Sequence, residues 1–121
     1  MNKLIGRQQD QKLVLNERGC IHFVDLANIY YLLCEAYLTT IFSKNKTEIT
    51  VSKLLKEFEN DLDSFGFFRI NRNCIVNLRY ISQVKTGKEP KVQLNSDLSF
   101  HLSKKRLIEL RKRLKSFEGV I

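Results

Sequence analysis

The sequence predicts a mostly β domain with one short helix in the middle of the chain and one helix at its C-terminal end. Short apolar stretches separated by turn-forming residues dominate the chain, and several of them alternate apolar and polar residues as half-buried strands do. Only two stretches carry apolar residues at spacings of three and four, the pattern of an amphipathic helix. This order of elements differs from that of an alternating βαβ chain.

Ten stretches are expected to form strands, because they are rich in the β-branched, aromatic and aliphatic residues that suit a pleated surface. They are residues 12–15, 21–25, 28–34, 37–42, 47–51, 67–70, 74–78, 81–85, 91–94 and 98–102. In the second stretch Ile21 and Phe23 share one face, which leaves His22 on the opposite face as a surface residue. The third stretch is continuously apolar and is expected to be buried on both faces.

Two helices are expected, and each has a start signal and a stop signal. Ser52 is the expected N-cap of the first helix, and Gly66 ends its pattern. The apolar stripe of this helix is Leu54, Leu55, Phe58 and Leu62. Ser103 is the expected N-cap of the last helix, and Gly119 is its natural stop. The buried stripe of the last helix is Leu107, Leu110, Leu114 and Phe117.

The length of 121 residues suits one domain, which we expect to span residues 12–118 after an N-terminal extension of residues 1–11. Lys and Arg total 21 against 13 Asp and Glu, so the formal net charge is +8. Such an excess indicates an anionic partner, and nucleic acid is favoured over a membrane surface. No stretch approaches the ~20 apolar residues of a spanning helix. No signal peptide is evident at the start, so we expect a cytoplasmic protein.

The sequence gives no support to an enzyme. It lacks a P-loop, an HExxH motif and a glycine-rich dinucleotide fingerprint, and two histidines with scattered acids single out no catalytic set. The three cysteines form no CxxC pair, and an odd number argues against a secreted disulfide framework. We therefore expect no catalytic residue, no cofactor, no metal and no small-molecule substrate.

The first of two basic clusters spans residues 69–73 and lies between two apolar strands. It contains Arg72 flanked by Asn71 and Asn73. Arg can bind guanine O6 and N7 with two hydrogen bonds, and Asn can bind adenine N6 and N7 in the same way. An ordinary solvated β turn is the competing interpretation of the same residues.

The second basic cluster lies at the start of the last helix, where Lys104, Lys105 and Arg106 follow Ser103. Free N–H groups and the helix dipole attract phosphate at this position, whereas cations there are unfavourable in an isolated helix. A polyanion would relieve that conflict. The competing interpretation is that these cations only solubilise an amphipathic helix.

Residues 67–81 resemble the central signature of LytTR domains, in which Phe-x-Arg-x-His-Arg-Ser is followed by an aromatic residue and Ile/Val-Val-Asn-Leu. The matching residues are Phe67 or Phe68, Arg69, Arg72, Ile75, Val76, Asn77, Leu78 and Ile81. Three other blocks resemble the family in the same order. They are the Asp-Ile-x-Tyr-x-x-x-Glu tract (Asn28, Ile29, Tyr31, Glu35), the helix before the signature (51–59) and the closing strand with its Ser-Arg-Arg motif (102–106). The resemblance covers about residues 12–117.

The resemblance implies an elongated, antiparallel β domain whose loops enter successive major grooves of bacterial promoter DNA at repeated half-sites and bend it. The family's base-reading positions correspond here to Tyr37 or a neighbour, to Arg72 and to Lys105. Asn73, Lys104 and Arg106 would support phosphate or adjacent base contacts. Asn71, at the position of the family's His, completes the predicted set of DNA-binding residues. Self-association on repeated half-sites is a further expectation.

The chain departs from the family pattern at several positions. Asn71 replaces the usual His, Asn73 the usual Ser, and Cys74 a common aromatic residue. The tract that follows the early Tyr-containing strand is about two residues shorter than usual, so Tyr37, Leu38 and Thr39 compete for the first reading position. Altered reading residues should alter the DNA sequence that is bound and leave DNA binding itself intact.

The predicted function is sequence-specific binding of duplex DNA by a bacterial transcription regulator, either a stand-alone domain or the output domain of a response regulator in a two-component system. Two alternatives remain. One is a single-stranded RNA-binding module, which needs exposed aromatic residues on a sheet. The other is a protein-interaction adaptor whose basic surface only aids solubility.

Overall fold

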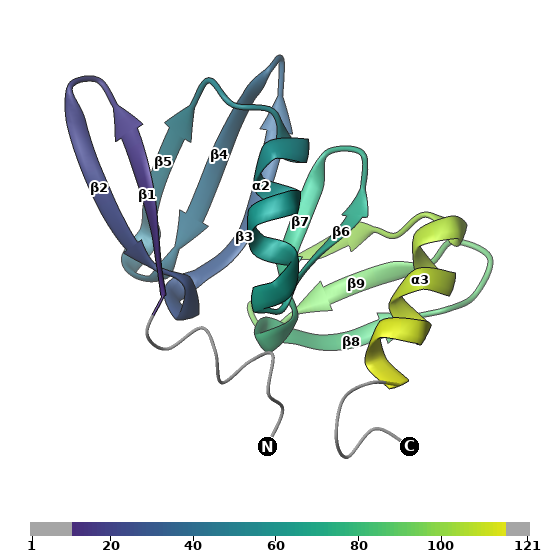
Figure 1. Ribbon diagram of the computed structural model, residues 1–121. Coiled ribbons are helices and arrows are strands. Elements are labelled where there is room, and N and C mark those ends of the chain that lie inside the picture. The colour runs from purple at the N-terminus through teal and green to yellow at the C-terminus, as the bar shows by residue number, and fades with distance from the viewer. Residues whose placement is uncertain (1–10, 116–121) are drawn as a thin grey trace.

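The computed structural model describes residues 11–115 of the chain. Within these residues ten strands form three antiparallel sheets, which follow one another across an elongated molecule (Figure 1). Two α-helices of the same residues pack against them. The expected mostly β, antiparallel fold with one central and one C-terminal helix is confirmed. Phe117 and Gly119 lie outside the described residues, and the expected domain limits of 12–118 stay a prediction.

The two-stranded sheet pairs β1 (Lys12–Glu17) with β2 (Cys20–Asp25) through a turn at Arg18 and Gly19. Ile21 and Phe23 do share one face, but this face is the outer one, where their side chains are 60% and 66% exposed. His22, expected on the surface, is half-buried, with 32% of its side chain exposed. The register pairs His22 with the buried Leu15, and the His22 Nε2 atom lies 3.4 Å from Glu17 Oε1. Alternation shows which residues share a face, and the packing decides which face is covered.

The central sheet has five strands in the order β5-β4-β3-β7-β6. Their bounds are β3 (Ile29–Glu35), β4 (Leu38–Ser43), β5 (Thr47–Val51), β6 (Phe67–Asn71) and β7 (Cys74–Asn77). The third sheet has the order β10-β9-β8, with β8 (Ile81–Lys85), β9 (Lys91–Leu94) and β10 (Ser99–His101). All ten expected strands are present, with ends that shift by a few residues.

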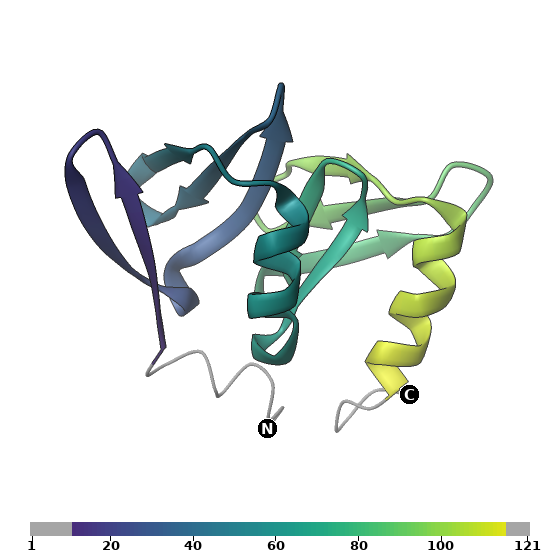
Figure 2. The ribbon, with the colours of Figure 1, turned by 45° about the horizontal axis from the view of Figure 1, so that its top comes forward.

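Two hydrophobic cores hold the sheets and helices together. One core joins the β1–β2 hairpin, the central sheet and α2 (Leu55–Leu62) around Leu32, Phe58 and Phe67. The other joins β6 and β7 to the third sheet and to α3 (Lys104–Lys115) around Ile70, Val76 and Leu110. The helices α2 and α3 therefore stand on either side of the β6–β7 hairpin (Figure 2).

The start of α3 agrees with the sequence prediction, whereas the start of α2 does not. Ser52 is not the N-cap of α2. The helix begins at Leu55 after Leu54, whose backbone is extended, and the Lys53 carbonyl before it accepts a hydrogen bond from the Thr39 hydroxyl at 2.6 Å. Leu54 is 52% exposed and does not belong to the apolar stripe, which is formed by Leu55, Phe58 and Leu62. By contrast, Ser103 caps α3 as expected, since its Oγ accepts a hydrogen bond from the Arg106 N–H at 3.1 Å.

Asn77, at the end of β7, is fully buried and joins distant parts of the chain. Its amide Nδ2 donates to the carbonyls of Leu26 at 3.3 Å and Ile29 at 2.9 Å, and its Oδ1 accepts from the Arg79 N–H at 3.0 Å. A buried amide satisfied on both sides fixes the start of β3 against the end of β7.

No helix within residues 11–115 has the length and apolar character needed to cross a membrane.

Candidate nucleic-acid interface

Three segments reach the same edge of the molecule: the β3–β4 turn, the β6–β7 turn and the start of α3. They lie along the upper edge in both ribbon views (Figures 1 and 2). The segments are far apart in the sequence, and they include all seven residues that the sequence predicts to bind DNA. This edge is the candidate interface.

Arg72 and Asn73 of the β6–β7 turn are exposed to solvent, whereas the backbone of the turn is hydrogen-bonded by side chains of β6. Arg69 Nη2 donates to the Arg72 carbonyl at 2.8 Å, and Arg69 Nε donates to the Asn71 carbonyl at 3.3 Å. The Asn71 Oδ1 accepts from the Asn73 N–H at 2.8 Å, which closes the turn from the inside. The chain therefore fixes the main chain of Arg72 and leaves its guanidinium available.

The start of α3 combines exposed cations with a helix N-terminus. Lys104 and Lys105 are both exposed, and the first turn of the helix carries no acidic residue. The guanidinium of Arg106 is engaged within the protein, since its Nη1 lies 3.2 Å from Glu109 Oε2 and 3.5 Å from Glu59 Oε2. Lys104 and Lys105 are thus more available to an anion than Arg106 is.

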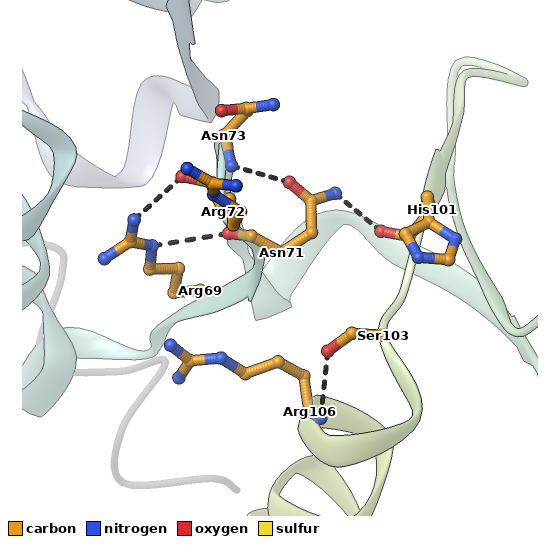
Figure 3. Close-up of a pocket in the computed structure, with 7 residues that line it drawn as sticks. All are labelled: Arg69, Asn71, Arg72, Asn73, His101, Ser103 and Arg106. Atoms are coloured by element: carbon orange, nitrogen blue, oxygen red, sulfur yellow. Dashed lines mark hydrogen bonds between the residues drawn. The ribbon is translucent and has the colours of Figure 1, made fainter.

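The two basic segments are joined directly. Asn71 Nδ2 donates to the His101 carbonyl at 2.6 Å, and the Ser103 N–H donates to the Ile70 carbonyl at 3.3 Å. Between the segments lies an open cleft of about 510 Å³ (Figure 3). Its lining residues are Arg69, Asn71, Arg72, Asn73, His101, Ser103 and Arg106. Three arginines line this cleft: Arg69 and Arg106 are ion-paired with Glu59, whereas Arg72 is exposed. Clustered cations suit such a cleft to a polyanion.

The β3–β4 turn is built differently. Tyr37 lies at its tip with 81% of its surface exposed, and both Ala36 (φ 49°) and Tyr37 (φ 66°) adopt the left-handed conformation. Thr39 is fully buried and cannot reach a ligand, whereas Leu38 is 45% exposed. Among the three residues that compete for this position, Tyr37 is the most accessible. The Cys34 N–H donates to the Asn73 carbonyl at 2.8 Å and so ties this hairpin to the β6–β7 turn.

The structure brings together the predicted residues Arg72, Asn73, Lys104 and Lys105 as exposed groups, and their contacts with DNA stay predictions. Asn71 and Arg106 lie at the same place, but their side chains bind other parts of the protein. Sequence reasoning did not assign roles to Arg69, His101 and Glu59. The available signal was the position of Arg69, two residues before the end of a mainly apolar strand that leads into the turn. Nothing in the local sequence connects Glu59 to this site.

A cleft lined by three arginines between a hairpin turn and a helix N-terminus, with exposed lysines beside it, is the kind of basic surface that nucleic-acid-binding domains present. The family model of the LytTr DNA-binding domain matches residues 19–115, and the chain belongs to this family.

Among solved structures, the chain is similar to the LytTr DNA-binding domain of a methyl-accepting/DNA response regulator from Bacillus cereus. The TM-score is 0.72 at 21% sequence identity, over 85% of this chain and 95% of that chain. This likeness shows the shared fold. No curated protein matches the chain.

Proposed function

We propose that this chain binds duplex DNA sequence-specifically at promoter half-sites and thereby acts as a bacterial transcription regulator. The observation that carries the proposal is the junction of the β6–β7 turn and the start of α3 on one cleft, which the exposed Arg72 lines. Lys104 and Lys105 are exposed between the lining residues Ser103 and Arg106 in the sequence. Membership of a DNA-binding family supports the same conclusion.

The two segments would have different roles in DNA binding. Arg72 stands on a turn with a fixed main chain, so it can place two parallel donors against guanine in the major groove. Lys104, Lys105 and the free N–H groups of α3 suit backbone phosphates, which set the position of the protein on the duplex. Lys105 can also reach a base edge if the helix end enters a groove.

The wider setting follows from this function. A regulator of bacterial promoters acts in the cytoplasm, either alone or as the output domain of a response regulator. Repeated half-sites would place two copies side by side on the same duplex, where self-association adds cooperativity. A single bound species without cooperativity on a two-half-site duplex would contradict self-association and leave DNA binding intact.

The alternative of a single-stranded RNA module finds little support in the sheet surfaces. Phe67 and Phe68 are 1% and 6% exposed, so they cannot stack on bases. Phe23 is 66% exposed on the outer face of the β1–β2 sheet and Tyr37 is 81% exposed at a turn, so the two exposed rings do not lie together on one sheet with the basic cleft.

The test is selection of bound duplexes from a random pool, followed by titration of the selected duplex at several salt concentrations. We expect an enriched motif, and log affinity should fall with log salt at a slope of about −0.9 per phosphate neutralised. Competition with single-stranded RNA should not displace the duplex. Failure to bind any duplex at low salt would contradict the proposal and favour a protein-interaction adaptor.

A further inference from the structure

Glu59, on the central turn of α2, lies behind the interface and contacts both of its arginine-bearing segments. Its Oε1 lies 3.1 Å from Arg69 Nη1, and its Oε2 lies 3.5 Å from Arg106 Nη1. The side chains of Glu59, Arg69 and Arg106 are 27%, 19% and 28% exposed. One carboxylate therefore joins three elements that are distant in the sequence, namely α2, β6 and α3.

Each arginine bound by Glu59 also holds part of the interface. Arg69 donates to the carbonyls of Asn71 and Arg72 and so fixes the turn that carries Arg72. Arg106 belongs to the first turn of α3, next to Lys104 and Lys105, and its N–H binds the cap Ser103. A displacement of either guanidinium would therefore move groups that face the DNA.

We propose that Glu59 is a positioning residue for DNA recognition: by bridging Arg69 and Arg106 it fixes the β6–β7 turn relative to the start of α3. The inference rests on the proposed function. Glu59 sets the spacing between Arg72 and the lysines of α3, which must match the spacing of the groups on the duplex. It contributes to selectivity without touching DNA.

The carboxylate is suited to this role because it has two acceptor oxygens for two guanidinium groups. Glutamine at the same position has one acceptor oxygen, and its amide N–H₂ would face the second arginine. The variant Glu59→Gln thus keeps the size of the side chain and breaks at least one of the two bridges.

The direction of the effect separates this role from simple electrostatics. A carboxylate behind a DNA-binding surface repels phosphate, so its neutralisation alone would raise the affinity for every duplex, most of all at low salt. The positioning role predicts that Glu59→Gln lowers affinity for the selected duplex on the order of tenfold, which corresponds to the lower end of the range for a hydrogen bond to a charged group. Affinity for a scrambled duplex should stay equal or rise, so the selectivity ratio falls.

The experiment measures the affinity of the wild type, Glu59→Gln and the control Asp61→Asn for selected and scrambled duplexes at one salt concentration. Asp61 is an exposed carboxylate on the same helix, so its neutralisation changes the net charge equally and should preserve the ratio. In an Arg72→Ala background, Glu59→Gln should no longer lower the affinity for the selected duplex, because the base-reading group that it positions is gone.

A second variant covers the case in which Glu59→Gln reduces the folded population. Arg69→Lys keeps the charge, but an ammonium group cannot span Glu59 and two carbonyls at once, so it should reproduce the loss of selectivity. If the wild type binds no duplex, the proposed function fails. If the wild type is selective and both folded variants keep its selectivity ratio, the positioning role of Glu59 is overturned.

Discussion

The β6–β7 turn and the β3–β4 turn lie on the same edge of the molecule, but they are held in different ways. The β6–β7 turn is fixed by side chains of Arg69 and Asn71, which bind its own carbonyls and N–H groups and those of β10. The β3–β4 turn has Tyr37 at its tip and two consecutive residues with positive φ. In the first turn, specific contacts lock an unstrained hairpin. In the second, strand pairing forces ordinary residues into a conformation that costs energy.

A small β domain can therefore present DNA-contacting side chains on two kinds of turn. A locked turn gives Arg72 a defined starting point for two parallel hydrogen bonds, which need accurate geometry. A strained tip that presents one aromatic ring suits adaptable contacts with phosphate or a base. Strain at such a position is retained where function requires it. Four experiments test this difference between the locked turn and the strained turn.

The largest difference between the two turns should be in the reactivity of the cysteine thiols that lie next to them. Cys74 begins β7 directly after the locked turn and is 1% exposed, and burial raises the pKa of its thiol to about 12. At pH 8 its thiolate is then about one ten-thousandth of the population. Cys34 lies beneath the β3–β4 turn and is half-buried, and Cys20 is exposed. Alkylation at pH 8 with mass spectrometry should modify Cys20 first, Cys34 next and Cys74 only after denaturation. Equal rates for Cys74 and Cys34 would show that the locked turn opens.

The next effect is the loss of a reading group from the locked turn. Arg72→Ala should cost about 1–3 kcal/mol on the selected duplex and relax selectivity at one base pair. Lys104→Ala should instead weaken selected and scrambled duplexes by similar factors, as expected for a phosphate contact. Fluorescence anisotropy on both duplexes measures the two variants. An equal loss on both duplexes for Arg72→Ala would mean that this residue does not read bases.

Removal of the lock itself should lower stability. Asn71→Ala deletes the hydrogen bonds to the Asn73 N–H and the His101 carbonyl, which at about 1 kcal/mol each lowers the free energy of unfolding by about 1–2 kcal/mol. Asn73→Ala is the matched control, because the contacts of Asn73 in the turn are made by its main chain. Urea denaturation compares the two. Equal stability of both variants would show that the Asn71 side chain does not lock the turn.

The smallest effect should be a gain of stability at the strained turn. Replacing Ala36 and Tyr37 by Asn and Gly supplies residues that accept positive φ, and should raise the free energy of unfolding by about 1 kcal/mol. Tyr37→Ala removes the ring but keeps the backbone strain, so it separates the two contributions. If Tyr37 contacts DNA, both variants should weaken binding although only the first is more stable. A lower free energy of unfolding for the Asn-Gly variant would show that the β3–β4 turn is not strained.

Much of this arrangement could be predicted from the sequence, because residue chemistry and periodicity are local. The strands, the Ser103 cap and the two basic clusters all follow from short stretches. The start of α2 could not be predicted from a local pattern, since the segment before it is bound to β4 by the hydrogen bond between Thr39 and Lys53. The outer face of β2 was misplaced for a similar reason, because the pairing of His22 with Leu15 decides which face is buried.

The candidate site was predictable in its exposed groups but not in its support. Arg and Asn in a polar turn, and cations before a helix, are visible as patterns. The bridge from Glu59 to Arg69 and Arg106 spans 10 and 47 positions in the chain, so only the packing of α2 against the interface reveals it.

The most direct test of the candidate interface is to map which residues of the protein contact DNA. Titration of isotope-labelled protein with the selected duplex, followed by amide chemical shifts, should perturb the β3–β4 turn, the β6–β7 turn and the start of α3. Residues of the β8–β9 connection and of the β1–β2 outer face should change little. Perturbations that cluster on Arg111, Lys112 and Lys115 and spare Arg72, Lys104 and Lys105 would show that DNA binds elsewhere.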